Sequence, residues 1–171
     1  FSIDSLIEML GHAGVRVTVP QNARARAQAA RHIIGHVLPD AIMGSLEQAL
    51  PGETLGESGM MWNPYFRGVK GFEREDRIWE FFAFMSGGMG ARSTKDGLSA
   101  TAFPSGVKCV PVEAWETTVP LVIWRKELRP DSGGAGMYRG GFGQIIEISS
   151  YNGEPLRLQA MFERVENPAK G

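Results

Sequence analysis

The first fifty residues carry apolar side chains mostly at helical spacing. In residues 2–10 the apolar positions are 3, 6, 7 and 10, and in residues 23–37 an apolar stripe includes 29, 30, 33, 34 and 37. We expect a helix at Ser2–Leu10, a strand at Val15–Val19, a helix at Ala23–Val37 and, beyond Pro39, a second helix at Ala41–Leu50. Segment 1–51 is therefore predicted to be mainly helical.

After Gly52 the pattern changes to short apolar runs separated by glycine and proline, which is typical of strands and turns. The predicted strands are Arg77–Met85, Leu98–Phe103, Val119–Leu128, Gln144–Ser149 and Leu156–Phe162. Arg77–Met85 is apolar at nearly every position, so we expect a central strand that is buried on both faces. Asn152-Gly153 predicts a hairpin between its two flanking strands.

These two patterns predict an α+β fold, with N-terminal helices followed by a mainly antiparallel β-sheet with long glycine-rich loops. Residues 52–171 would form the β-rich C-terminal region of the same domain as the helical segment. With 43% hydrophobic and 22% charged residues, the 171-residue chain has a globular composition.

Charge and cysteine content narrow the range of partners. The formal net charge is −1, so we expect neither nucleic acid nor a membrane surface as a partner. The apolar run at Trp79–Met85 is too short to span a bilayer. Cys109 is the single cysteine, which excludes an intrachain disulfide and predicts a reducing, cytoplasmic location.

The stretch Asp131–Gly143 is the first candidate for binding chemistry. It holds six glycines in thirteen residues, whose backbone N–H groups could surround an anion beside the guanidinium of Arg139. It has neither the Gly-Lys-Ser/Thr of a Walker loop nor the spacing and following helix of a Rossmann turn. The alternative is a tightly packed connection between two strands, with glycine where backbones approach closely.

A second candidate loop, Ser86–Arg92, follows the predicted central strand. Loops at the ends of such strands often carry binding residues, and here Arg92, Lys95 and Asp96 are the useful side chains. The alternative is a wide surface turn that is closed by an Arg92–Asp96 pair.

Three further features have simpler structural interpretations. His32 and His36 are at i and i+4, the spacing of a metal pair, but no third ligand is evident, so we interpret them as partly exposed helix residues. Cys109 is interpreted as a buried structural thiol, because no histidine follows His36 to act as its base. The aromatic segment Trp62–Arg67 fits a pocket or interface lining and core packing equally well.

No catalytic set is contained in these residues. All three histidines come early, which excludes a Ser-His-Asp order, and there is no carboxylate–histidine cluster and no ATP motif. We therefore predict no metal ligand and assign no catalytic residue.

Several motifs in a fixed order carry a family resemblance. They are Ser86–Arg92 with Asp96-Gly97, Pro111-Val112-Glu113, Leu128–Gly136 running into Arg139-Gly140-Gly141, and Glu163-Arg164-Val165 with Pro168–Gly171. Together they resemble the C-terminal part of the hydantoinase B/oxoprolinase family, over about residues 24 to 171.

The resemblance implies a much longer protein, in agreement with a chain that begins at Phe1 and ends at Gly171 without the look of natural domain boundaries. It implies a B-type subunit that opens hydantoin or oxoproline rings in an ATP-dependent assembly. In that family an A-type partner handles ATP, and the metal site, where present, lies in the N-terminal portion. ATP and a divalent metal are thus implied for the full oligomeric assembly, and none is expected to be bound by this chain.

The family also includes subunits of acetone and acetophenone carboxylases. Where many members have a histidine-containing polar stretch, this chain has Ser99–Gly106, which leaves cyclic amide hydrolysis and ketone carboxylation both open.

Our first hypothesis is a C-terminal domain that is inactive alone and docks an A-type subunit and the N-terminal part of its own chain. Its predicted substrate-binding residues are Arg92, Asp96 and Arg139, beside a glycine-rich loop with Gly133, Gly134, Gly136, Gly140 and Gly141. The alternative is a non-catalytic module that binds a nucleotide or another small molecule through that loop.

Overall fold

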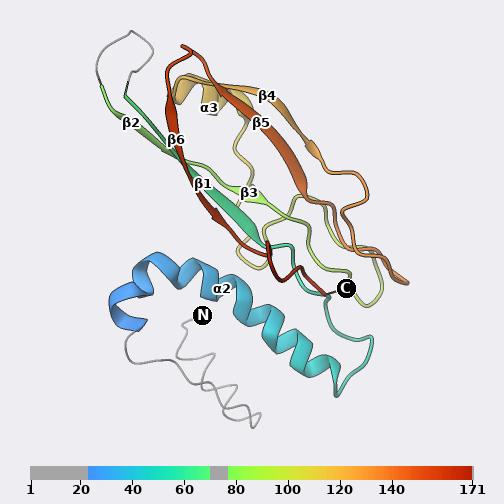
Figure 1. Ribbon diagram of the computed structural model, residues 1–171. Helices are drawn as coiled ribbons and strands as arrows, with labels where there is room; N and C mark the ends of the chain where they lie inside the picture. Colours follow the sequence, from blue (N-terminus) through green and yellow to red (C-terminus); the bar gives the residue numbers. More distant parts are fainter. Residues whose placement is uncertain (1–22, 70–76, 171) are drawn as a thin grey trace. The chain divides into compact units, whose positions relative to one another are not determined.

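The computed structural model describes residues 23–69 and 77–170 of the chain, with side chains from residue 33 onward (Figure 1). The chain forms two compact units, Phe1–Ile34 and Gly35–Gly171, and the predicted change at Gly52 falls inside the second. The helix expected at Ser2–Leu10 and the strand expected at Val15–Val19 lie outside the described residues.

Helix α2 runs without a break over Ala23–Glu47 and contains Pro39, so the prediction of two helices separated at this proline was wrong. A proline inside a helix removes one backbone hydrogen bond. Contacts on both sides of Pro39 offset that loss. The ring of His36 hydrogen-bonds the carbonyl of Phe103 at 2.9 Å, and the carboxylate of Asp40 is buried in an ion pair.

The main sheet is built around β1 (Met61–Gly68), which the sequence analysis did not identify as a strand. It pairs antiparallel with β6 (Leu156–Phe162) along one side. Along its other side it pairs with β2 (Trp79–Phe82) and then β3 (Met85–Ser86), also antiparallel. The central strand is therefore β1, and the expectation of a central strand at Arg77–Met85 was wrong.

Pro64 explains both the missed strand and the division between β2 and β3. The two strands share one register on β1, from Tyr65 opposite Phe82 to Trp62 opposite Met85, and the break falls opposite Pro64. The carbonyl of Pro64 accepts a hydrogen bond from the N–H of Ala83 at 3.0 Å, but proline has no N–H to return one. The ladder is interrupted at that point.

A second antiparallel pair consists of β4 (Leu121–Leu128) and β5 (Gln144–Ser150), as predicted within two residues at each end. The short helix α3 (Val112–Thr118) precedes β4 and was not predicted. β5 pairs with β4 and β6 pairs with β1, so the turn at Asn152-Gly153 joins two sheets, and the predicted hairpin was wrong.

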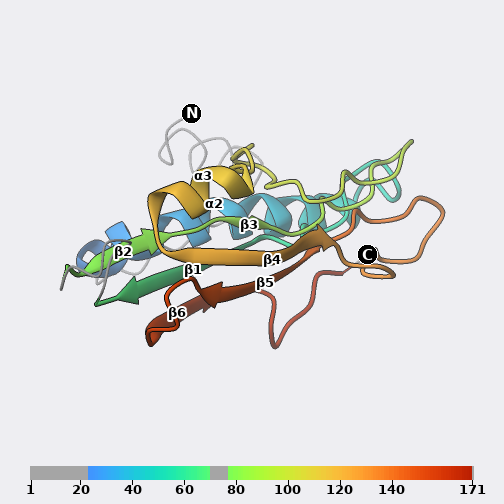
Figure 2. The same cartoon turned by 90° about the horizontal axis from the view of Figure 1, so that it is seen from above.

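The apolar core of the second unit lies between the main sheet, α3 and the β4–β5 pair (Figure 2). Phe66 and Ala83 from the sheet pack against Trp115 of α3 and Leu121 of β4. The ring of Trp115 is 1% exposed and meets Phe81 edge to face, with 5.3 Å between ring centroids. This cluster holds the strands that carry the loops of the candidate site.

The predicted α+β class is confirmed by the helices and antiparallel strands. Leu98–Phe103 is not a strand, because Ala100 takes a left-handed φ of 50° in a turn. Among the described residues, none of the helices has the length and apolarity needed to cross a membrane. The cytoplasmic location stays a prediction.

Candidate functional site

Several glycine-bearing segments meet at one end of the strands and form a layer in which backbone packs directly on backbone. The N–H of Gly59 donates to the carbonyl of Gly88 at 2.8 Å, and the N–H of Gly141 donates to the carbonyl of Met89 at 2.8 Å. Further bonds join Gly56 to Ala91, Gly87 to Met60, Met89 to Leu98 and Gly97 to Arg139. We call the segments 56–60, 86–98 and 133–143 the glycine layer.

Glycine is required at several positions of this layer because neighbouring backbones leave no room there for a side chain. A Cβ atom on Gly88 would overlap the carbonyl of Gly141, and one on Gly141 would overlap the carbonyl of Leu98. The sequence-based alternative for Asp131–Gly143, a tightly packed connection between two strands, is therefore confirmed: it links β4 to β5. Close approach of main chains is one of the recurring reasons for glycine.

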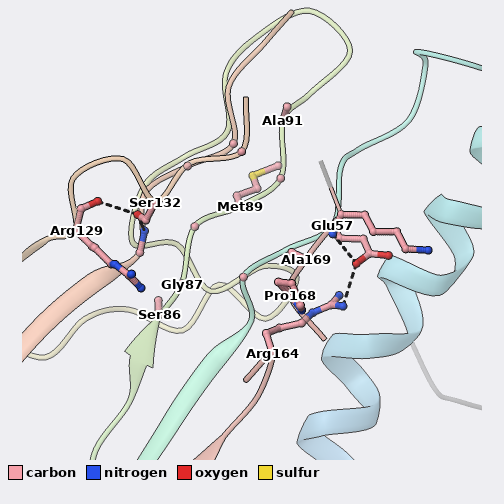
Figure 3. A pocket seen from close by; sticks show the side chains of 18 of the residues that line it. Glu57, Ser86, Gly87, Met89, Ala91, Arg129, Ser132, Arg164, Pro168 and Ala169 are labelled. Atoms are coloured by element: carbon pink, nitrogen blue, oxygen red, sulfur yellow. Dashed lines mark hydrogen bonds and ion pairs between the residues drawn. The ribbon is translucent and has the colours of Figure 1, made fainter. Parts of the chain in front are cut away.

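A cavity of about 390 Å³ opens against this layer (Figure 3). Its walls come from the loop after β3, the connection between β4 and β5, and the C-terminal segment 163–170. Its non-glycine lining includes apolar side chains (Trp62, Met85, Met89, Tyr138, Pro168) and charged ones (Glu57, Arg129, Glu163, Arg164, Lys170). A volume of this size, mostly apolar with a few polar groups, is typical of a small-molecule site.

Arg129 lies at the end of β4 with its backbone held on both sides. Its N–H donates to the carbonyl of Gly143 at 2.9 Å, and its carbonyl accepts from the hydroxyl of Ser132 at 2.8 Å. The Ser132 oxygen also accepts from the N–H of Gly143 at 2.9 Å. Figure 3 shows the Arg129 side chain extending toward Ser86, at the end of β3.

Arg164 forms the opposite wall and joins two carboxylates. Its guanidinium lies 2.7 Å from Asp40 Oδ2 and 2.9 Å from Glu57 Oε2. Burial raises the pKa of Asp40 above its ordinary value, and the hydrogen bond from the Ser58 N–H and the charge of Arg164 oppose that rise. Glu57 also accepts from the N–H of Lys170 at 3.0 Å, so this ion cluster holds the C-terminal segment in place.

The predicted substrate-binding residues lie on the glycine layer but outside the cavity lining. Arg92 donates from Nε and Nη2 to the carbonyl of Asp96, at 3.0 and 2.6 Å, so its loop is closed through backbone and not through the carboxylate. Asp96 Oδ1 accepts from the N–H of Arg139 at 2.7 Å, and the Arg139 guanidinium lies 5.8 Å from the ring centre of Phe142. Their role in substrate binding stays a prediction.

Of the predicted loop glycines, Gly134, Gly136, Gly140 and Gly141 line the cavity, and Gly133 packs behind them. The aromatic segment Trp62–Arg67 serves both uses that the sequence left open, because Trp62 lines the cavity and Phe66 lies in the core. Sequence reasoning gave no site role to Glu57, Arg129 or Arg164, and the two arginines entered it only as members of the family motifs. Arg129 is the one with a local signal, since it stands between a strand and a Pro-Asp turn.

Two sequence interpretations need correction. Cys109 is exposed and free, not buried, because it lies in the loop before α3 and not in the core. His36 is 4% exposed, not partly exposed, because its ring packs against the carbonyl of Phe103. Within residues 33–69 and 77–170, no group of three or more His, Cys, Asp or Glu side chains is placed to hold a metal ion.

The sequence model of the hydantoinase B/oxoprolinase family matches residues 14–171. The B subunit of a putative D-/L-hydantoinase of Pseudomonas sp. (strain NS671) is 31% identical over 121 residues, which is 70% of this chain and 20% of that protein. The beta subunit of the Pseudomonas jessenii caprolactamase is 32% identical over 128 residues, with the same shares.

Two further relatives belong to acetone carboxylases. The alpha subunit of the Xanthobacter autotrophicus enzyme (strain ATCC BAA-1158 / Py2) is 38% identical over 78 residues, 43% of this chain and 10% of that one. A solved nucleotide-free acetone carboxylase structure superimposes with a TM-score of 0.54 at 25% identity, over 66% of this chain and 15% of that one. The chain spans a fifth or less of these relatives, and it belongs to the hydantoinase B/oxoprolinase family.

Proposed function

We propose that this chain is the C-terminal domain of the B-type subunit of an ATP-dependent enzyme that hydrolyses a cyclic amide. The observation that carries the proposal is the family membership together with the names of two relatives. The hydantoinase and caprolactamase subunits each align over 70% of this chain, and hydantoin and caprolactam are both cyclic amides. The carboxylase subunit aligns over 43%.

In this proposal the domain supplies one wall of the substrate site, and the reacting groups come from elsewhere in the assembly. The cavity of about 390 Å³ has room for a small ring, with apolar contacts from Trp62 and Met89. Binding and orientation of the ring are tasks that such a wall can perform. The described lining of the cavity holds neither histidine nor cysteine, so the ring-opening step is not assigned to it.

The ATP and the divalent metal that the family implies are proposed to bind outside this domain. The described side chains do not fit a metal, because none of their His, Cys, Asp and Glu residues form a ligand cluster. The glycine-rich connection between β4 and β5 is followed by a strand and not by a helix N-terminus, which is where phosphates are usually bound. An A-type partner subunit is the proposed ATP-handling component.

The test is reconstitution of the intact protein with the product of an adjacent A-type gene. We expect ATP hydrolysis that depends on both subunits and on a cyclic amide, measured with hydantoin, 5-oxoproline and caprolactam as separate substrates. Calorimetry of this chain alone with ATP should show no saturable binding. Tight ATP binding by the chain alone would instead support a nucleotide-binding module.

A second candidate is a subunit domain of an ATP-dependent ketone carboxylase. It is favoured by the alignment of highest identity among these relatives, 38% with the acetone carboxylase alpha subunit, and by the similar fold of the solved carboxylase. The same reconstituted assembly separates the two. Consumption of acetone with bicarbonate and ATP, without ring opening of any cyclic amide, would select the carboxylase.

A further inference from the structure

The arginines around the glycine layer differ in what their side chains already bind. Arg92 uses its guanidinium to close its own loop, and Arg164 is shared between two carboxylates. Arg139 lies over the ring of Phe142, outside the cavity lining. Among the described cavity-lining residues, Arg129 is the arginine whose guanidinium has no hydrogen-bond or ion-pair partner.

The position of Arg129 is fixed although its guanidinium is unpartnered. Its backbone N–H and carbonyl are both hydrogen-bonded within the base of the β4–β5 connection. Asp131, two residues on, has a φ of 55°, so the chain turns sharply directly after this point. Because this backbone is already ordered, only the side chain has to be ordered when a ligand binds.

The charges around the cavity leave an excess of positive charge at the Arg129 wall. On the opposite wall the single positive charge of Arg164 is shared by Asp40 and Glu57, at 2.7 and 2.9 Å, so it is already balanced by carboxylates. Glu163 and Lys170, the remaining charged lining residues, belong to the same C-terminal segment as Arg164 and carry opposite signs. The guanidinium of Arg129 is therefore a cation whose N–H donors are available to an anion that enters the cavity.

We propose that Arg129 binds an oxyanion, a carboxylate or a phosphoryl group, of a small molecule whose apolar part packs against Trp62 and Met89. The planar guanidinium offers two parallel N–H donors, which match two oxygens of either group. The apolar side chains of the cavity lining are placed to contact the apolar part of the bound small molecule. The inference rests on the cavity being part of the substrate site in the proposed function, and it replaces Arg92 and Arg139 by Arg129 as the anion ligand.

The test compares three matched variants of the purified chain, R129Q, R139Q and R92Q, each of which removes one positive charge from the same region. The probes are inorganic phosphate and hexanoate, titrated by calorimetry or ligand-observed NMR, with a thermal melt to verify folding. We expect the unmodified chain to bind one of the two probes. R129Q should weaken that binding at least tenfold, R139Q and R92Q less than twofold, and R129K should fall between them.

Binding of phosphate would indicate a phosphoryl ligand, and binding of hexanoate would indicate a carboxylate. The inference is overturned if neither probe binds the folded chain, if R129Q binds as well as the unmodified chain, or if R139Q or R92Q loses as much affinity as R129Q. These measurements need neither ATP nor the A-type partner. Failure of ring opening in the reconstituted assembly would therefore reject the proposed function, and the measured anion binding by Arg129 would still stand.

Discussion

The apolar core and the glycine layer are both tightly packed, but in opposite ways. In the core, Trp115 and Leu121 are each 1% exposed and fill space with large side chains. In the glycine layer, Gly88 and Gly141 have no side chain, and neighbouring carbonyls occupy the volume that a Cβ would take. The core should therefore be sensitive to the removal of atoms, and the layer to their addition.

The largest effect is expected when the core loses its largest buried side chain. Trp115→Ala should lower the free energy of unfolding by about 3–5 kcal/mol, because it removes a fully buried ring and leaves a cavity. Urea unfolding followed by circular dichroism measures the change. Trp115→Phe is the matched control and should lose clearly less, since it keeps a ring against Phe81. A loss below about 1 kcal/mol for the alanine variant would contradict a packed core.

The addition of one methyl group to the glycine layer tests the other half of the comparison. Gly88→Ala should destabilise the chain by about 2–3 kcal/mol, as overpacking does where the obstructing atoms are backbone. Gly44→Ala is the control: Gly44 lies in α2 with nothing within 4 Å of the added Cβ. That change should instead stabilise by about 0.5–1 kcal/mol. Equal changes in unfolding free energy for the two substitutions would show that the layer can accommodate a Cβ atom at residue 88.

The ion cluster at the edge of the layer tests whether polar contacts contribute as well. Arg164→Met leaves Asp40 and Glu57 without their shared cation, which costs several kcal/mol for a fully buried pair. Because the Arg164 side chain is 20% exposed, we expect a smaller loss of about 2 kcal/mol. Thermal and urea unfolding measure it. If Asp40→Asn in the Arg164→Met background causes a further loss as large as in the unmodified chain, the two residues are not coupled.

The smallest expected effect is the pH dependence of stability, which tests one carboxyl group specifically. Burial raises the pKa of folded Asp40 above its ordinary value of 3.8, so the folded state holds this proton more tightly than the unfolded chain does. The contribution of Asp40 to stability should therefore fall as the pH rises through a window that begins near 3.8.

Unfolding free energies of the unmodified chain and the Asp40→Asn variant, compared from about pH 3.5 to about pH 6, isolate this contribution. The difference in stability, unmodified minus variant, should decrease with rising pH. A difference that grows with pH would mean that the attraction of Arg164 outweighs the burial of the carboxylate.

The sequence predicted those elements whose pattern is local. Strands β4, β5 and β6 carry β-branched or alternating apolar runs and were found nearly residue by residue. Strand β1 was missed because Pro64 and the polar Asn63 interrupt its pattern, although both are buried by packing against other parts of the chain. The exposure of Cys109 and the burial of His36 likewise depend on contacts far apart in the sequence.

In the candidate site, too, local features were predictable from the sequence and features that depend on the fold were not. The glycine-rich connection was visible because glycine is a strong local signal, and close backbone packing was one of the two uses that this residue type suggested. Whether an arginine faces a cavity or closes its own loop depends on the path of the backbone around it. Arg92, Arg129 and Arg139 look alike in the sequence, and the fold distinguishes them.

Pro64 places a break in the ladder on one side of the central strand. Because the imino nitrogen carries no hydrogen, the ladder opposite it is interrupted between β2 and β3 before it resumes in the same register. The loop Ser86–Ala91 begins at the end of β3, the short strand after that interruption, and forms one wall of the cavity. A hydrogen absent from the middle of one strand thus divides its neighbour into two short strands, and replacing Pro64 by valine would restore the missing donor and let β2 and β3 join into one strand.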